Sequence, residues 1–436
     1  MTTTAVAPQP LKGVRIVDLT WMLASAGTTV LLSSLGAEVI RIEWPGHLDF
    51  TRRQLVAKPK PPPLGPLKPP SGLPKSVRDM PEANTSGLFS DRNAGKLGIT
   101  LNMRHHEGVE LFKKLVAISD IVIEGFRPNA MLSWGLDYET LKAIKPDIIY
   151  LQMAGFGRTG PYSSFASYGP TAQVMSGIGA LTGLPEPHPP TMWNHSYMDV
   201  TPPFYGATAL MAALYYRNRT GEGQYIDQGQ YEPGLLLSGT AVLDYSAHGR
   251  KTARAGNRSP HIAAAPHGIY RCAGDDSWIA ITVFDEQEWR ALCQHLGDPE
   301  WCGEPAFATM QDRLQNLDAL DAHIEQWTRS QDRYELMYRL QEAGVAAGAV
   351  QSPRDKFELD PQLKARDFFV DLPQSRIGTW PHTRHFTPKL TKTPAHPGGV
   401  TQRGAPCVGE DNRYVYEKLL GLSAEEVAHF EERGVI

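Results

Sequence analysis

Short apolar strands and helices alternate through the first 150 residues of this 436-residue chain. The apolar pattern predicts buried strands at 14–19, 38–43, 99–101, 120–123 and 147–152, and helices at 24–35, 106–118 and 138–144. Strands that are joined through helices favour a parallel sheet with helices on its faces. The chain therefore predicts an α/β fold.

The pattern changes after residue 227. Residues 230–340 predict a smaller α+β domain, with paired strands at 269–273 and 277–283 and helices at 286–296, 317–330 and 334–343. A helix is also expected at 235–247. From 345 to 436 the chain returns to short strands, proline-rich loops and a last helix near 412–420. The segment 58–75 is dense in proline and predicts a surface insertion.

Charge and composition exclude several classes of protein. The net charge of −4 disfavours nucleic acid as a partner, because polyanion-binding domains are usually basic. The apolar run 204–216 is too short to cross a bilayer, so no membrane association is expected. The N-terminus does not resemble a signal peptide, and the four scattered cysteines form no CxxC pair. We expect a cytoplasmic protein without a metal site.

Gly155, Gly157 and Gly160 match the GxGxxG pattern after a predicted strand. Pro161 follows at once, no helix is expected next, and no acidic residue stands about twenty positions further on. NAD is therefore disfavoured, and the glycines indicate a tight turn or a ligand close to the backbone. The sequence contains neither the GxSxG motif of serine hydrolases nor the HExxH motif of zinc enzymes.

Asp199 precedes the apolar run 204–216, which predicts a helix. Thr201 is a candidate N-cap and Pro202 a candidate first helical residue, so the carboxylate would lie near the positive end of the helix dipole. One interpretation is a residue that only caps the helix. The other is an ionised, fixed carboxylate of the kind that covalent catalysis on an acyl group requires.

Several separated motifs, in the same order, resemble those of the family III CoA-transferases. They are LKGVRIVDLT at 11–20, LGAEVIRIE at 35–43, IEGFRP at 123–128, the glycines at 155–160, TGEGQYID at 220–227 and AEEV at 424–427. The resemblance covers roughly residues 11–436 apart from the proline-rich insertion.

The resemblance implies a fold and an assembly. A Rossmann-like large domain would consist of residues 1–225 and 345–436, with the smaller domain between them. Two subunits would interlock as a homodimer.

It also implies an activity, the transfer of CoA from an acyl-CoA donor to a carboxylic acid. The family's nucleophile is an Asp fifteen residues before the end of an Ala-Ala-Leu helix, which corresponds to Asp199 and Leu214 here. The reaction would pass through an aspartyl–acyl anhydride and an aspartyl-CoA thioester. The positions implied to bind CoA are Leu23, Ala24, Trp44, Arg92, Lys96, Gly125, Phe126, Arg127, Ala154, Gly155, Phe156 and Gly157.

Residues near Asp199 and in the loop 256–268 are expected to line the acyl pocket: Tyr168, Trp193, His195, Tyr197, His261 and His267. The racemase branch of the family has a His where Tyr168 stands, and a neutral phenol is a poor base. The segment 259–267 replaces the glycine run of formyl-CoA transferases, which disfavours an oxalate-type substrate. A 2-methylacyl-CoA racemase and a non-catalytic CoA-binding protein remain as alternatives.

Overall fold

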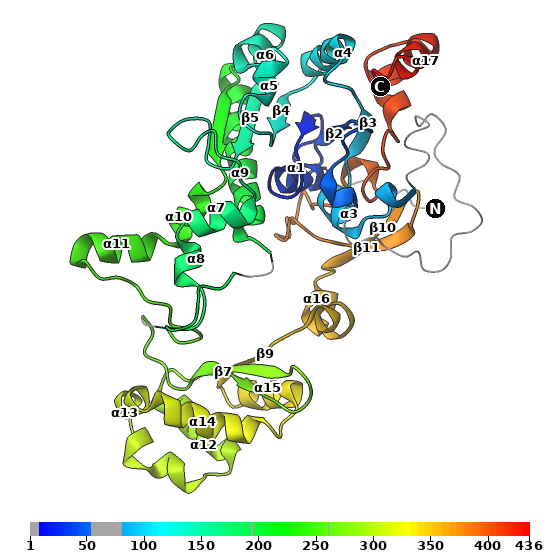
Figure 1. Ribbon diagram of the computed structural model, residues 1–436. Helices are drawn as coiled ribbons and strands as arrows, with labels where there is room; N and C mark the ends of the chain where they lie inside the picture. The colour runs from blue at the N-terminus through cyan, green and yellow to red at the C-terminus, as the bar shows by residue number, and fades with distance from the viewer. Residues whose placement is uncertain (1–7, 54–80, 193–194, 260) are drawn as a thin grey trace. The chain divides into compact units, whose positions relative to one another are not determined.

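The computed structural model describes residues 8–53, 81–192, 195–259 and 261–436. The chain forms two compact units (Figure 1). The large unit comprises Met1–Gly179, Met192–Gly249 and Lys364–Ile436, and the small unit comprises Ala180–Thr191 and Arg250–Leu363. The predicted insertion 58–75 and Trp193 lie outside the described residues.

The predicted α/β fold with a parallel sheet is confirmed. Within the described residues, the large unit has a six-stranded sheet in the order β3-β2-β1-β4-β5-β6, and every neighbouring pair is parallel. The strands are β1 (Arg15–Leu19), β2 (Glu38–Glu43), β3 (Leu97–Thr100), β4 (Ile121–Glu124), β5 (Ile149–Ala154) and β6 (Tyr225–Gly229). The strand order reverses between β1 and β4, and ligands of such sheets bind beyond the carboxyl ends of the strands at this point.

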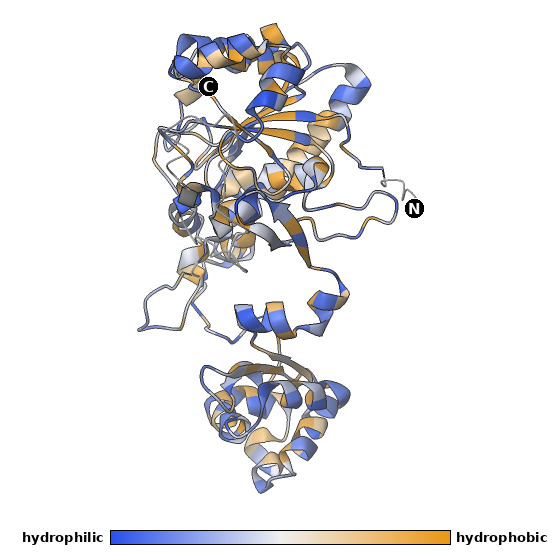
Figure 2. Ribbon diagram, turned by 90° about the vertical axis from the view of Figure 1, so that its right-hand side faces the viewer, coloured by the Kyte–Doolittle hydropathy of each residue, from blue (hydrophilic) through white to orange (hydrophobic). Residues whose placement is uncertain are grey.

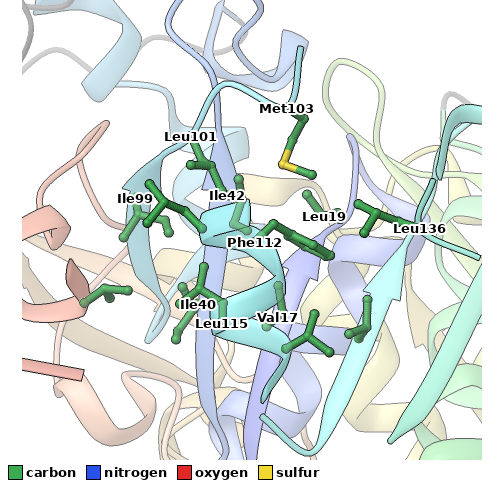
Figure 3. Packing of buried hydrophobic residues seen from close by; sticks show 14 of the residues in the cluster. Val17, Leu19, Ile40, Ile42, Ile99, Leu101, Met103, Phe112, Leu115 and Leu136 are labelled. Atoms are coloured by element: carbon green, nitrogen blue, oxygen red, sulfur yellow. The ribbon is translucent and has the colours of Figure 1, made fainter. Parts of the chain in front are cut away.

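Apolar side chains cover both faces of the sheet because alternate residues of a strand point to opposite sides. On one face, Val17 of β1 packs with Phe112 and Leu115 of helix α4 (His106–Ala117) (Figure 3). On the other face, Ile16 packs with residues of α1 (Ala24–Ser34) and α9 (Thr201–Thr220). The sheet strands are correspondingly hydrophobic in Figure 2. Two helical layers therefore enclose the sheet.

The large unit contains further helices. They are α3 (Gly87–Asn93), α5 (Ala130–Ser133), α6 (Tyr138–Ile144), α7 (Gly169–Met175), α10 (Glu232–Leu237), α11 (Gly239–His248) and α17 (Ala424–Glu432), with α8 (Ile178–Leu181) and α16 (Pro361–Ala365) where the chain passes from one unit to the other. The C-terminal part adds the hairpin of β10 (Phe369–Gln374) and β11 (Gly378–Thr383).

The small unit has its own core. The antiparallel strands β7 (His267–Arg271), β8 (Trp278–Thr282) and β9 (Ala346–Ala349) form a sheet. The helices are α12 (Glu286–Leu296), α13 (Met310–Gln315), α14 (Leu317–Thr328) and α15 (Arg333–Glu342). The buried helix residues, Trp289 and Leu336 among them, form one cluster with strand residues such as Ile281.

Two details differ from the expectations. The predicted helix 235–247 is two helices, α10 and α11, which meet at Ser238, and α10 packs against α9 and β6 of the large unit. The expected last helix near 412–420 is a π-helical segment, Tyr414–Leu419, and α17 follows it. None of the described helices is long and apolar enough to span a membrane.

Candidate active site

A cavity of about 1040 Å³ lies at the carboxyl ends of the parallel strands. The residues that follow β1, β2, β4 and β5 contribute to its wall, so the cavity lies where the strand order reverses. Six of the positions expected to bind CoA line it, together with one expected acyl-pocket residue. They are Trp44, Gly125, Phe126, Arg127, Ala154, Gly155 and Tyr168.

The loop after β4 is held by a buried carboxylate. Glu124 accepts hydrogen bonds from the backbone N–H of Phe126 and from the Gln152 side chain, the latter at 2.7 Å. Burial raises the pKa of Glu124 to about 7, although these hydrogen bonds and the charge of Arg158 oppose the rise. The loop 125–127 is therefore fixed by its own strand end and forms a preformed wall of the cavity.

A short turn holds Asp199 in place. The Ser196 hydroxyl accepts a hydrogen bond from the Met198 N–H at 3.0 Å, and the Gln173 side chain accepts one from the Tyr197 N–H at 2.8 Å. Gln230 donates to the Met198 carbonyl at 2.6 Å, and the Met198 side chain is fully buried. Three side chains and one apolar anchor thus fix the backbone on which the carboxylate stands.

The prediction that Thr201 is the N-cap of helix α9 and Pro202 its first residue is wrong. Helix α9 begins at Thr201 itself, the N-cap is Val200, and no side chain caps the helix. Asp199 instead ends the preceding 3-10 turn, Tyr197–Asp199. Its carboxylate is therefore not used up as a cap of α9 and remains available for another role.

Burial dominates the electrostatics of Asp199. Desolvation raises its pKa to about 6, although the charges of Arg92 and His195 and a hydrogen bond from Gln230 oppose the rise. The expectation of a carboxylate held ionised by its surroundings therefore needs correction. Asp199 is mostly ionised at neutral pH, but its surroundings favour the neutral form more than water does.

Gln230 connects this carboxylate to the cavity. Its side-chain amide donates to Asp199 Oδ1 at 3.4 Å, and Gln230 also lines the cavity. Tyr168, another lining residue, immediately precedes Gly169, whose backbone lies against the Asp199 carboxyl group. Asp199 does not itself line the cavity, and Gln230 and Tyr168 connect it to the cavity wall.

Other residues expected to bind CoA lie outside the cavity wall. Leu23 and Ala24 are at the start of α1, directly after the lining residue Met22. Arg92, on α3, is close enough for its charge to lower the pKa of Asp199. Lys96 is fully buried, and its amine contacts Asp18 Oδ2 at 3.0 Å.

The pair of Lys96 and Asp18 belongs to a charged network under the cavity. Burial lowers the pKa of Lys96 to about 8, whereas Lys96 and Arg41 together lower that of Asp18 to about 2 despite its burial. Arg41 also donates to the Thr20 carbonyl at 2.9 Å and bonds Asp49 at 2.5 Å. This network fixes the strand ends that carry the cavity wall.

Phe156 and Gly157 do not line the cavity but follow the lining residue Gly155. Phe156 is buried and packs against the lining residue Phe165, with ring centroids 6.2 Å apart. Gly157 has a φ of +78°, and the following N–H, of Arg158, donates to Asp227. The GxGxxG glycines thus make a tight turn beside β6, and no helix follows for a dinucleotide phosphate.

The expected acyl-pocket residues divide between the two units. Tyr168 lines the cavity, Tyr197 begins the turn that carries Asp199, and His195 precedes that turn. His261 and His267 belong to the small unit, where His267 Nδ1 lies 3.1 Å from the Thr282 hydroxyl. A role for these two histidines in the acyl pocket stays a prediction.

Gln230 and Arg104 are cavity residues that the sequence reasoning did not select. Gln230 stands directly after β6, and a residue at the carboxyl end of a parallel strand is a candidate for ligand binding. The sequence did not predict this position, because YIDQG is too polar to predict a strand. Arg104 precedes α4, far from any recognised motif.

Comparisons with known proteins agree with this geometry. The chain matches the family model for CoA-transferase family III over residues 11–412. It is 34% identical to succinyl-CoA–D-citramalate CoA-transferase of Chloroflexus aurantiacus, over 98% of both chains. It is 32% identical to acetyl-CoA:oxalate CoA-transferase of Acetobacter aceti, over 89% of this chain and 95% of that protein.

Among solved structures, a CAIB/BAIF family protein from Brucella suis superposes with a TM-score of 0.80 and 31% identity. The match covers 94% of this chain and 99% of that one. The family model spans nearly the whole chain, and both relatives are named as CoA-transferases. The protein is therefore a CoA-transferase and belongs to CoA-transferase family III.

Proposed function

We propose that Asp199 is the nucleophile that carries CoA between two carboxylic acids. The observation that supports this most strongly is the link from the Asp199 carboxylate through Gln230 to a cavity at the carboxyl ends of the strands. A carboxylate whose pKa is about 6 is ionised at neutral pH yet poorly solvated, which favours attack on an acyl carbon.

The CoA moiety occupies the cavity in this proposal. Arg104 and Arg127 line it and are both exposed, which suits phosphate groups at an open rim. The apolar side chains of Trp21, Met22 and Phe126 line the same wall and suit the pantetheine arm. The thioester end then points toward Gln230 and Asp199.

The proposed reaction proceeds through covalent intermediates on Asp199. Asp199 attacks the thioester carbonyl of the donor, and the CoA thiolate leaves, which gives an aspartyl–acyl anhydride. The thiolate then attacks the Asp199 carbonyl carbon and expels the first acid as a carboxylate. The second acid attacks the resulting aspartyl-CoA thioester, and the same two steps run in reverse on the new acyl group. Together, these steps replace one difficult exchange with several easier ones.

The relatives support a substrate class. The citramalate enzyme's name gives succinyl-CoA as the donor and a hydroxylated dicarboxylic acid as the acceptor. We infer that this protein also uses succinyl-CoA and accepts a dicarboxylic acid. Tyr168 stands at the cavity where a racemase would require a proton carrier, so racemisation is the weaker candidate.

The test combines substitution with trapping. Asp199→Ala and Asp199→Asn are assayed for CoA exchange from succinyl-CoA to a panel of dicarboxylic acids, and we expect both to lose exchange. Hydroxylamine added during turnover should modify the native Asp199 peptide, which mass spectrometry detects. Exchange at the wild-type rate by Asp199→Ala would refute the proposal. Deuterium uptake at the alpha carbon without exchange would favour the racemase instead.

A second copy of the chain completes the protein in this proposal. Helix α11 has no buried residue, its Leu243 is 71% exposed, and Leu236 of the preceding helix α10 is 66% exposed. An apolar surface of this kind is typical of an interface. We therefore infer a homodimer, and keep the interlocked arrangement and a cytoplasmic location as predictions. Sedimentation at several concentrations tests the dimer, and a single monomeric species at all of them would contradict it.

A further inference from the structure

We propose that the side-chain amide of Gln230 stabilises the oxyanion that forms on Asp199 itself, and that Gly169 fixes which face of the carboxyl group is attacked. This inference rests on the proposed role of Asp199 as the nucleophile. It assigns separate functions to the two carboxylate oxygens and adds Gln230 as a catalytic residue.

The hydrogen bonds of Gln230 distinguish the two oxygens. Its Nε2 lies 3.4 Å from Asp199 Oδ1 and 2.6 Å from the Met198 carbonyl, and Gln230 is 9% exposed. Within the described residues, no group donates a hydrogen bond to Asp199 Oδ2. Because Oδ1 faces a donor, Oδ2 is the oxygen whose lone pair is available to attack the donor's thioester.

Gly169 covers one face of the carboxyl group. A Cβ placed on Gly169 would lie 2.3 Å from Asp199 Oδ2 and 2.4 Å from both Cγ and Oδ1. Nearly equal distances to all three atoms put that position over the plane of the group rather than at its edge. The backbone of Gly169 therefore closes this face, and a nucleophile reaches Cγ from the opposite one.

The second step of the reaction then has a defined geometry. The thiolate sulphur bonds to Asp199 Cγ, and the electron pair of the carbonyl double bond moves onto Oδ1. When the tetrahedral intermediate collapses, the pair returns, the Cγ–Oδ2 bond breaks, and the first acid leaves as a carboxylate with Oδ2. No proton is gained or lost. The charge on Oδ1 develops beside the Gln230 amide, which is where a preorganised donor lowers the barrier most.

The hydrogen bond at 3.4 Å is long, as contacts to catalytic groups often are before substrate binds. The short bond to Met198 keeps the Gln230 amide in place in the meantime. The donor is thus held by the same turn that carries the carboxylate, and only a small movement is needed when charge accumulates on Oδ1.

Gln230→Met removes the donor and keeps the approximate length of the side chain. We expect kcat for exchange from succinyl-CoA to fall about 100- to 1000-fold, the usual effect of losing one oxyanion donor. The KM for succinyl-CoA should stay within about threefold, because Gln230 is proposed to stabilise charge that is present only in the transition state. Without an acceptor acid, formation of the covalent CoA adduct, followed by intact mass after acid quench, should slow by the same factor as kcat.

Gln228→Met is the matched control. Gln228 is also buried at the end of β6, and its amide donates to the Pro202 carbonyl at 2.9 Å, but no recorded contact joins it to Asp199. We expect this variant to keep kcat within about threefold of wild type. Gln230→Glu, which retains the shape and replaces the donor with an acceptor, should lose at least as much activity as Gln230→Met. Thermal melting of each variant establishes that it is folded.

The outcomes separate the two proposals. Both Gln230 variants within about fivefold of wild type would overturn the inference, and so would an equal loss in Gln228→Met or a rise in KM without a fall in kcat. If Asp199→Asn, measured alongside, retains exchange, the proposed nucleophile itself is refuted. An inactive Asp199→Asn with fully active Gln230 variants would overturn only the role of Gln230.

Discussion

Replacing Asp199 with Asn should inactivate the protein and stabilise it at the same time. Burial raises the pKa of Asp199 from 3.8 to about 6, so the folded protein binds its proton more tightly than the unfolded chain does. The ionised carboxylate therefore costs stability, and this cost grows as the pH rises from about 4 to 6 and is constant above that. Asn has a similar shape and carries no charge, so it removes the cost.

The shift of about two pKa units corresponds to about 3 kcal/mol at pH 7.5, at about 1.4 kcal/mol per unit. The same relation gives about half of that at pH 5, where the folded protein already holds the proton. Asp199 is partly exposed, so these values are upper limits. We therefore expect Asp199→Asn to unfold at higher urea concentration than wild type at pH 7.5, with a smaller difference at pH 5.

Urea unfolding followed by tryptophan fluorescence, at one protein concentration and both pH values, measures this difference. Asp275→Asn is the control, because Asp275 is exposed in a turn and its substitution should change stability little at either pH. An Asp199→Asn variant that is no more stable than wild type at pH 7.5, or a gain that does not depend on pH, would refute the reasoning. It would show that burial does not penalise the Asp199 charge.

Three further predictions concern neighbouring residues. Arg92→Met should raise the pKa of Asp199, because the Arg92 charge lowers it, and should move the acid limb of the kcat/KM profile to higher pH; an unmoved limb would contradict this. Lys96→Met should lower the free energy of unfolding by about 1.5–3 kcal/mol, because buried Asp18 loses one of its two cationic partners and keeps Arg41, while calorimetry of a folded sample finds CoA affinity unchanged. Gly169→Ala should abolish exchange through its clash with the carboxyl group, whereas Gly303→Ala, where a Cβ meets nothing within 4 Å, should not; an active Gly169→Ala variant would exclude the proposed geometry.

Local sequence patterns determined the elements of the fold. Strand β2 and helices α6 and α12 have the predicted bounds, because their apolar spacing allows only one periodicity to bury its side chains. Helix α17 was not predicted although Ser423 and Glu426 form a capping box, a local signal that went unused. Strand β6 could not be predicted in this way, because it is short and polar and forms only by pairing with β5.

The family resemblance predicted a CoA site that includes Phe126, Arg127 and Gly155, and all three line the cavity, whereas the catalytic role of Asp199 stays a prediction. The resemblance did not determine the chemical state of the carboxylate. Helix-end reasoning considers only neighbours along the chain, whereas the pKa of Asp199 depends on burial and on Arg92, which the sequence places more than a hundred residues away. Lys96 shows the same limit, since its location in a buried network with Asp18 follows from the order of the strands and not from its own neighbours.

The fold class and the family follow from the sequence alone, because the apolar periodicity and the order of the motifs are local properties of the chain. The positions of Gln230 and Gly169 beside the Asp199 carboxylate, and of Lys96 away from the cavity wall, depend on how the chain folds. Such contacts join segments far apart in the chain, and they exist only once the parallel sheet has brought the ends of its strands to one edge.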